Sequence, residues 1–126
     1  MNVTEAAENY LEAILMLSEN KSEIHAADIC AHLGFSRPTV SVMLKTLRQN
    51  GYVTVDELNH VRLTETGTAI AMHVYERHKI LSALFISLGV TPATAYEDAC
   101  KVEHDLSAET FARICEFVQA LENAET

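Results

Sequence analysis

The sequence predicts a mainly α-helical fold in which one β-hairpin interrupts a series of helices. Apolar residues recur at the helical period over most of the 126 residues. One short stretch, residues 53–63, alternates instead with a period of two. Glycine, proline or asparagine stands at most of the breaks between these segments. An apolar content of 48% without any long apolar run favours a globular chain and argues against a membrane span.

Three helices are expected before the hairpin. They are predicted at residues 4–19, 27–33 and 37–49. Gly34 supplies a turn residue after the second helix, and Ser36 is the expected N-cap of the third, with Pro38 in its first turn. Asn50-Gly51 ends the third helix.

The hairpin and three further helices complete the chain. Val53 and Val55 alternate with polar neighbours, as do Val61 and Leu63, and Leu58-Asn59 lies between the two strands. Helices are then expected at residues 64–88, 92–103 and 108–123, the first being the longest element of the chain. Two domains are expected, residues 1–66 and residues 67–126.

Two short helices around a glycine turn, followed by a hairpin, predict an N-terminal winged helix-turn-helix. Apolar residues at the expected contact positions support this interpretation, and we expect them to be buried between the two helices: Ile29, Leu33, Phe35, Val40 and Met43. Such a fold either binds DNA or contacts another protein with its basic residues merely solvated.

The charge distribution favours DNA. The net charge is −9, yet residues 29–55 contain no acidic residue. The apolar stripe of the third helix is expected to face the core. Six other residues of this helix are then expected to face solvent: Arg37, Thr39, Ser41, Val42, Lys45 and Arg48. Cationic and hydroxyl side chains suit phosphates and base edges, and a valine suits a thymine methyl group. Arg62 and His60 on the hairpin are expected to reach the DNA backbone or the minor groove.

A second pattern lies near the C-terminus, where Cys100, Glu103 and His104 are spaced at i, i+3 and i+4. On a helix these side chains share one face. A thiolate, a carboxylate and an imidazole can together bind a borderline divalent cation. The alternative is a half-buried helix carrying cysteine as a small apolar residue. Cys30, Cys100 and Cys115 are an odd number and too widely spaced for a disulfide framework, which indicates reduced thiols. No basic, then apolar, leader follows Met1, so a cytoplasmic protein is expected.

With the winged helix and this later motif together, the chain resembles the diphtheria toxin repressor family of iron- and manganese-dependent regulators. The resemblance covers nearly the whole chain, and its most specific part is residues 97–107. The other matching segments are Glu8–Glu12, Ser36–Ser41, Leu63–Gly67 and Arg77-His78. The implied fold is an N-terminal winged helix-turn-helix DNA-binding domain plus a C-terminal helical metal-binding and dimerisation domain, in a short form without an SH3-like domain.

The resemblance also implies site residues. Metal ligands are implied at six positions: Asn9, Glu12, His78, Cys100, Glu103 and His104. Ser36 and Pro38 join the residues implied to contact DNA. Asn9 departs from the methionine of iron regulators and the aspartate of manganese regulators. Ser82 and Tyr96 stand where an ancillary site would need a glutamate and a histidine.

The function implied is a metal-dependent transcriptional regulator, a repressor of metal-uptake genes rather than an enzyme. Iron(II) is the favoured ion and manganese(II) the next, because a thiolate ligand disfavours manganese. A homodimer on a palindromic duplex DNA operator is expected, without membrane association. The alternatives are a winged-helix regulator gated by thiol oxidation or by an organic ligand, and a small metalloenzyme.

Overall fold

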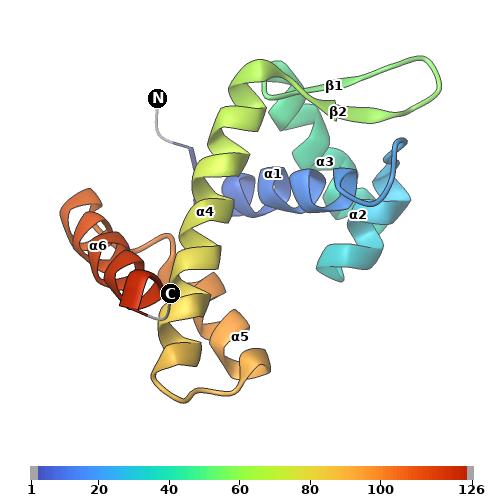
Figure 1. Cartoon of the computed structure of the whole chain (residues 1–126). Coiled ribbons are helices and arrows are strands. Elements are labelled where there is room, and N and C mark those ends of the chain that lie inside the picture. Colours follow the sequence, from blue (N-terminus) through green and yellow to red (C-terminus); the bar gives the residue numbers. More distant parts are fainter. Residues whose placement is uncertain (1–2, 125–126) are drawn as a thin grey trace. The chain divides into compact units, whose positions relative to one another are not determined.

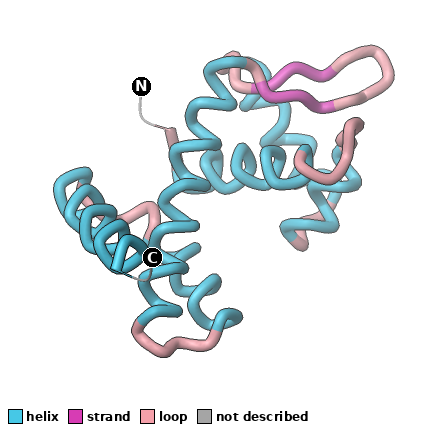
Figure 2. The backbone as a smooth tube through the Cα atoms, in the orientation of Figure 1, coloured by secondary structure: helices cyan, strands magenta, loops and turns pink. Residues whose placement is uncertain are grey.

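The computed structural model describes residues 3–124 and confirms the mainly α fold (Figure 1, Figure 2). Within these residues the elements are α1 Glu5–Ser18, α2 Ala26–Leu33, α3 Arg37–Gln49, β1 Val53–Val55, β2 Val61–Leu63, α4 Glu65–Ser87, α5 Pro92–Val102 and α6 Ala108–Ala124. Every expected helix and strand is present, with its ends displaced by no more than about one residue. None of the helices in this part of the chain is both long enough and apolar enough to cross a bilayer.

The chain divides into two compact units, Met1–His73 and Val74–Thr126. The division falls inside α4, whose first turns belong to the first unit and whose remainder belongs to the second. Each unit is described separately below.

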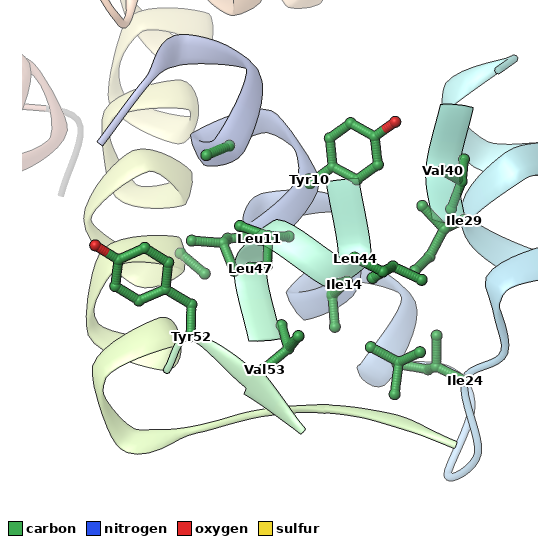
Figure 3. Close-up of a cluster of buried hydrophobic side chains, with 13 residues drawn as sticks. Tyr10, Leu11, Ile14, Ile24, Ile29, Val40, Leu44, Leu47, Tyr52 and Val53 are labelled. Carbon is green, nitrogen blue, oxygen red and sulfur yellow. The ribbon is translucent and has the colours of Figure 1, made fainter. Parts of the chain in front are cut away.

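The core of the first unit lies among α1, α2, α3 and the hairpin. Figure 3 shows Leu11 and Ile14 of α1 among side chains from α3 and β1. Ile29 of α2 and Val40 of α3 are fully buried, as the helix-turn-helix pattern predicts. Burying each such side chain stabilises the fold by about 1.5–3 kcal/mol. Helix α3 is therefore held by apolar contacts on one side, and its other sides remain exposed.

The turn between α2 and α3 has the expected chemistry. Gly34 adopts φ 75°, in the left-handed region that glycine enters without strain. Ser36 then caps α3, since its Oγ accepts a hydrogen bond from the backbone N–H of Thr39. The predicted burial of Phe35 is wrong, because its side chain is 47% exposed. It lies in the turn, where its ring stacks on that of Tyr10 at a centroid distance of 6.0 Å.

The hairpin is antiparallel, with Val55 paired to Val61 and Thr54 paired to Arg62. Its loop is organised by Asp56, whose Oδ1 accepts hydrogen bonds from the backbone N–H groups of Leu58 and His60, each at 2.9 Å. The backbone N–H of His60, and then that of Leu58, help to hold the pKa of Asp56 below its usual value.

His60 was expected to reach outward from the hairpin toward DNA, and this prediction is wrong. Its side chain is only 11% exposed, and its ring nitrogens lie 3.2 Å from an Asp56 oxygen and 3.6 Å from a Glu23 oxygen. The ring also meets the edge of His25 at a centroid distance of 4.8 Å. His60 therefore joins the hairpin to the segment before α2 instead of reaching toward DNA, because two nearby carboxylates and a second imidazole hold it there.

In the second unit, the rest of α4 combines with α5 and α6. Its buried apolar residues are Val74, Leu81, Ala95, Ala99 and Val118. Thr91 precedes α5 as its N-cap, with Pro92 at the first position, which needs no amide donor. Cys30 and Cys115 are half-buried, and Cys100 is exposed; the structure records all three as thiols.

Candidate metal centre and recognition helix

The candidate metal centre begins at the C-terminal end of α5. Glu103 is the C-cap of this helix and keeps helical backbone angles, and its N–H donates to the carbonyl oxygen of Ala99. The helical geometry therefore extends to Glu103, so that Cys100 and Glu103 lie on one face as their spacing predicts. The Glu103 residue is only 1% exposed, which is unusual for a carboxylate.

Two imidazoles meet the Glu103 carboxylate. Nδ1 of His78, from α4, lies 3.2 Å from Oε2, and Nε2 of His104 lies 3.4 Å from Oε1. Ligand atoms of His78, Cys100 and Glu103 all lie within 4.8 Å of one another. The structure thus brings together a thiol, a carboxylate and an imidazole, with a second imidazole against the same carboxylate.

These residues fit a divalent cation. A buried carboxylate is costly unless something compensates its charge. The nearby Arg77 guanidinium donates to the backbone oxygens of Glu103 and Leu106. The carboxylate oxygens themselves lie against two imidazoles, which are metal ligands in their own right. Nitrogen, oxygen and sulfur donors in one small cluster are the set that borderline transition metals prefer.

The remaining two predicted ligands come from α1. Asn9 and Glu12 are separated by three residues and therefore share one face of that helix. Asn9 is half-buried, and Glu12 is buried, with 6% of its surface exposed. Both belong to the first unit, whereas the other four predicted ligands belong to the second. The participation of Asn9 and Glu12 in one centre therefore stays a prediction.

The two positions considered for an ancillary site carry neither the glutamate nor the histidine that such a site would need. Ser82 is buried on α4, one turn after His78. Tyr96 is exposed on α5, and its ring centroid lies 6.2 Å from that of His78. These positions offer a hydroxyl and a phenol where an ancillary site would need a carboxylate and an imidazole, and the absence of that site stays a prediction.

The predicted DNA-contacting residues are all exposed. They are Ser36, Arg37, Pro38, Thr39, Ser41, Val42, Lys45, Arg48 and Arg62. Val42 is 69% exposed, although valine is usually buried in a helix of this kind. Arg62 lies in β2, opposite Thr54 on β1. The exposed face of α3 is thus cationic and hydroxyl-rich, with the apolar side chain of Val42 near its middle.

Sequence reasoning missed two exposed positions on α3. Thr46 and Gln49 are exposed and follow Val42 at i+4 and i+7. The helical period starting from Val42 could have found them. Arg77 lies in a matching segment but was given no role, because nothing in the sequence shows that its guanidinium reaches two carbonyl oxygens beyond α5.

Comparison with known proteins assigns a family to each half of the chain. Residues 2–61 match the family model of the iron dependent repressor N-terminal DNA binding domain, and residues 64–125 match that of the iron dependent repressor metal binding and dimerisation domain. The chain is 36% identical over 115 residues to the transcriptional regulator MntR of Salmonella typhimurium, covering 91% of this chain and 73% of that protein. It is 33% identical to an HTH-type transcriptional regulator of Methanocaldococcus jannaschii, covering 93% and 95% of the two chains.

Solved structures agree with this grouping. The manganese regulator SloR superposes with a TM-score of 0.80 at 28% identity, over 94% of this chain and 55% of that one. The IdeR structure of T. acidophilum gives a TM-score of 0.80 at 27% identity, over 92% and 54%. The chain spans about half the length of these solved chains. Its two matched halves, in the same order along the chain, place it in the diphtheria toxin repressor family of metal-dependent transcriptional repressors.

Proposed function

We propose that this protein is a metal-responsive repressor whose operator affinity is controlled by Asn9, Glu12, His78, Cys100, Glu103 and His104. The observation that carries the proposal is the buried Glu103 carboxylate with the His78 nitrogen, the Cys100 thiol and the His104 nitrogen around it. A bound divalent cation would supply the positive charge that this carboxylate needs. The functional halves are residues 1–66 for DNA binding and 67–126 for metal binding and dimerisation.

The control would work through the position of α1. Glu12 and Glu103 carry like charges, which repel each other wherever they approach closely. His78, Cys100, Glu103 and His104 would hold the ion, and Asn9 and Glu12 would complete its ligand set from α1. Ligation from both halves would then fix the orientation of the winged helix. Linkage requires that DNA and metal strengthen each other's binding by the same factor.

Of iron(II) and manganese(II), iron(II) is the ion that this donor set favours. The Cys100 thiol lies within the ligand cluster, and a thiolate discriminates against manganese(II) relative to softer divalent ions. Manganese(II) is the second candidate, since the names of several relatives describe manganese regulators. We propose iron-uptake or manganese-uptake genes as the targets, with the repressor acting in the cytoplasm.

We propose a homodimer formed by residues 67–126. Between α4 and α6 lies a cavity of about 320 Å³, lined by residues that include Leu84, Ile114 and Phe117. Phe117 and Leu121 of α6 are exposed apolar residues, and a second copy of the chain would cover them in the dimer. Two recognition helices roughly 34 Å apart would then read the half-sites of a palindrome.

The test is an anaerobic DNA-binding titration by fluorescence anisotropy, on duplexes that the wild-type protein selects from a random pool. Iron(II) or manganese(II) is expected to tighten binding by at least about tenfold over a chelator control, through linkage between the two sites. Glu103→Gln is expected to remove this response. Asp105→Asn, an exposed acid two residues further on, is the matched control and should keep it. Equal DNA affinity with and without metal would contradict the proposal.

A further inference from the structure

The exposed surface of α3 consists of two stripes with different chemistry. Arg37, Ser41, Lys45 and Arg48 follow one another at helical intervals and form the cationic stripe. Thr39, Val42, Thr46 and Gln49 do the same and form the neutral stripe. All eight residues are exposed, so neither stripe is used in the core.

The cationic stripe forms one wall of a cleft. The cleft has a volume of about 320 Å³, and α3, the hairpin and the first residue of α2 enclose it. Arg37, Lys45 and Arg48 all line it, whereas none of its lining residues is acidic. Three cations around one concave space favour an anionic occupant.

The opposite wall comes from the hairpin and is uncharged. Val55 and Val61, a directly paired couple, line the cleft together with Asn59. Because strand side chains alternate between faces, the Thr54–Arg62 pair points to the other face of the hairpin. Asn59 has φ 64°, and Asp56 organises the loop around it through two backbone hydrogen bonds. The wall is therefore shaped before any ligand arrives.

We propose that this cleft holds the sugar-phosphate backbone of one DNA strand; the inference rests on the proposed function and goes beyond it. When α3 enters the major groove, the strand that borders the groove must pass beside the helix. The cleft offers that strand three cations on one side and a smooth, uncharged hairpin on the other. The neutral stripe is then left to read base edges, with Thr46 and Gln49 added to Thr39 and Val42.

This division separates affinity from sequence preference. Phosphate contacts fix position and set the salt dependence of binding, whereas base contacts set specificity. Substitutions in the cationic stripe should thus weaken binding to every sequence alike. Substitutions in the neutral stripe should change which sequence is preferred and leave the salt dependence alone.

The decisive experiment fills the cleft without changing any charge. Ala26 lines the cleft, whereas its exposed neighbour Ala27 does not, so Ala26→Phe and Ala27→Phe form a matched pair. Both full-length variants are titrated, with saturating manganese(II), on a duplex that the wild-type protein selects from a random pool. Ala26→Phe is expected to bind at least about tenfold more weakly with a shallower salt slope, because each displaced phosphate contact lowers the slope by about 0.9. Ala27→Phe is expected to stay within about twofold of wild type.

Charge variants provide a test that does not depend on the folding of Ala26→Phe. Arg48→Gln is expected to reduce the salt slope by about one on selected and random duplexes alike. Lys21→Gln removes a cation of the same unit that does not line the cleft, and should leave the slope unchanged. Gln49→Ala should alter the selected sequence while the slope stays at the wild-type value.

Two results would overturn the inference while leaving the proposed function intact. One is metal-dependent binding by a folded Ala26→Phe protein with wild-type affinity and slope. The other is cleft-dependent binding of pyrophosphate, used as a small-anion probe, combined with a wild-type duplex slope for Arg48→Gln. If the wild-type protein selects no duplex at any metal concentration, the proposed function itself fails, and the inference fails with it.

Discussion

Arg77 donates a hydrogen bond from Nη1 to the backbone oxygen of Glu103, at 3.1 Å. The same nitrogen donates to the oxygen of Leu106 at 3.0 Å, and the guanidinium lies 4.9 Å from the Phe111 ring centroid. A side chain of α4 thereby fixes the turn between α5 and α6. Arg77 is a positioning residue for the candidate metal centre, because it orients the segment that carries Glu103.

Arg77→Ala is expected to weaken iron(II) or manganese(II) binding by about 10–100-fold, the range typical of residues that orient metal ligands. Calorimetric titration of the full-length protein measures this. Arg77→Lys should recover only part of the loss, because an ammonium lacks the planar, rigid donor arrangement of a guanidinium. Unchanged metal affinity in a folded Arg77→Ala protein would contradict the positioning role.

Cys100→Glu is expected to raise the response to manganese(II) relative to iron(II). The substitution replaces a soft donor by a hard one that manganese prefers. Anaerobic operator titrations with both ions provide the ratio of the two half-saturation concentrations. Cys115→Ser, a half-buried thiol on α6, is the matched control and should leave that ratio unchanged. If the ratio is the same in wild type and Cys100→Glu, the Cys100 thiol is not a ligand.

Asp28 is expected to stabilise the fold in a pH-dependent way. Its carboxylate accepts hydrogen bonds from Lys21 Nζ at 2.6 Å and from the backbone N–H of His25 at 2.8 Å. The Lys21 hydrogen bond, followed by that from His25, lowers the pKa of Asp28 from its usual value. A carboxyl group whose pKa is lowered on folding contributes stability above its unfolded pKa, and that contribution is lost as pH falls through the folded value.

Asp28→Ala should therefore reduce the free energy of unfolding by about 1 kcal/mol at pH 7, the usual size of a capping interaction, because Asp28 is the N3 residue whose side chain accepts from the N-cap His25. The difference from wild type should shrink as pH falls below about 4, where the aspartate is increasingly protonated. Urea titrations at several pH values provide both quantities. Glu57→Ala, at an exposed loop position, is the control. A deficit that stays constant down to pH 3 would show that the carboxylate charge plays no part.

Gly67→Ala is expected to destabilise the first unit. A Cβ atom built at Gly67 would lie 1.9 Å from the backbone oxygen of Tyr52, and a backbone atom cannot rotate away. Overpacking of this kind costs about 1–3 kcal/mol or more. Ala69→Gly, on the exposed side of the same helix, should cost only about 0.5–1 kcal/mol through backbone entropy. Comparable losses for the two variants in urea titrations would mean that the backbone at position 67 moves away freely.

Local patterns were sufficient to predict the helices, the hairpin and the helix ends at Gly34 and Ser36. Ser36 and Gly34 form their hydrogen bonds and turns with residues only a few positions away, so their roles can be predicted from the local sequence. The failures at Phe35 and His60 have a different origin. The hydrophobicity of Phe35 predicts burial, but it carries no information on whether the turn leaves an apolar space for the ring. The alternation of apolar and polar residues places His60 in a hairpin, but it does not predict that Asp56 and Glu23 hold its ring.

The candidate site could be predicted in part for the same reason. The spacing of Cys100, Glu103 and His104 determines a helix face, whereas the approach of His78 depends on the packing of α4 against α5, across 25 residues of sequence. Only the family resemblance suggested His78. The Arg77 contacts span 26 and 29 residues and have no local signature at all.

The two stripes of α3 also bear on how such a repressor can evolve. If charge and base reading occupy different positions on one helix, a change at Val42, Thr46 or Gln49 alters operator choice while the electrostatic hold on DNA persists. After gene duplication, one copy could thus acquire a new set of target promoters by single substitutions, without passing through a form that no longer binds DNA.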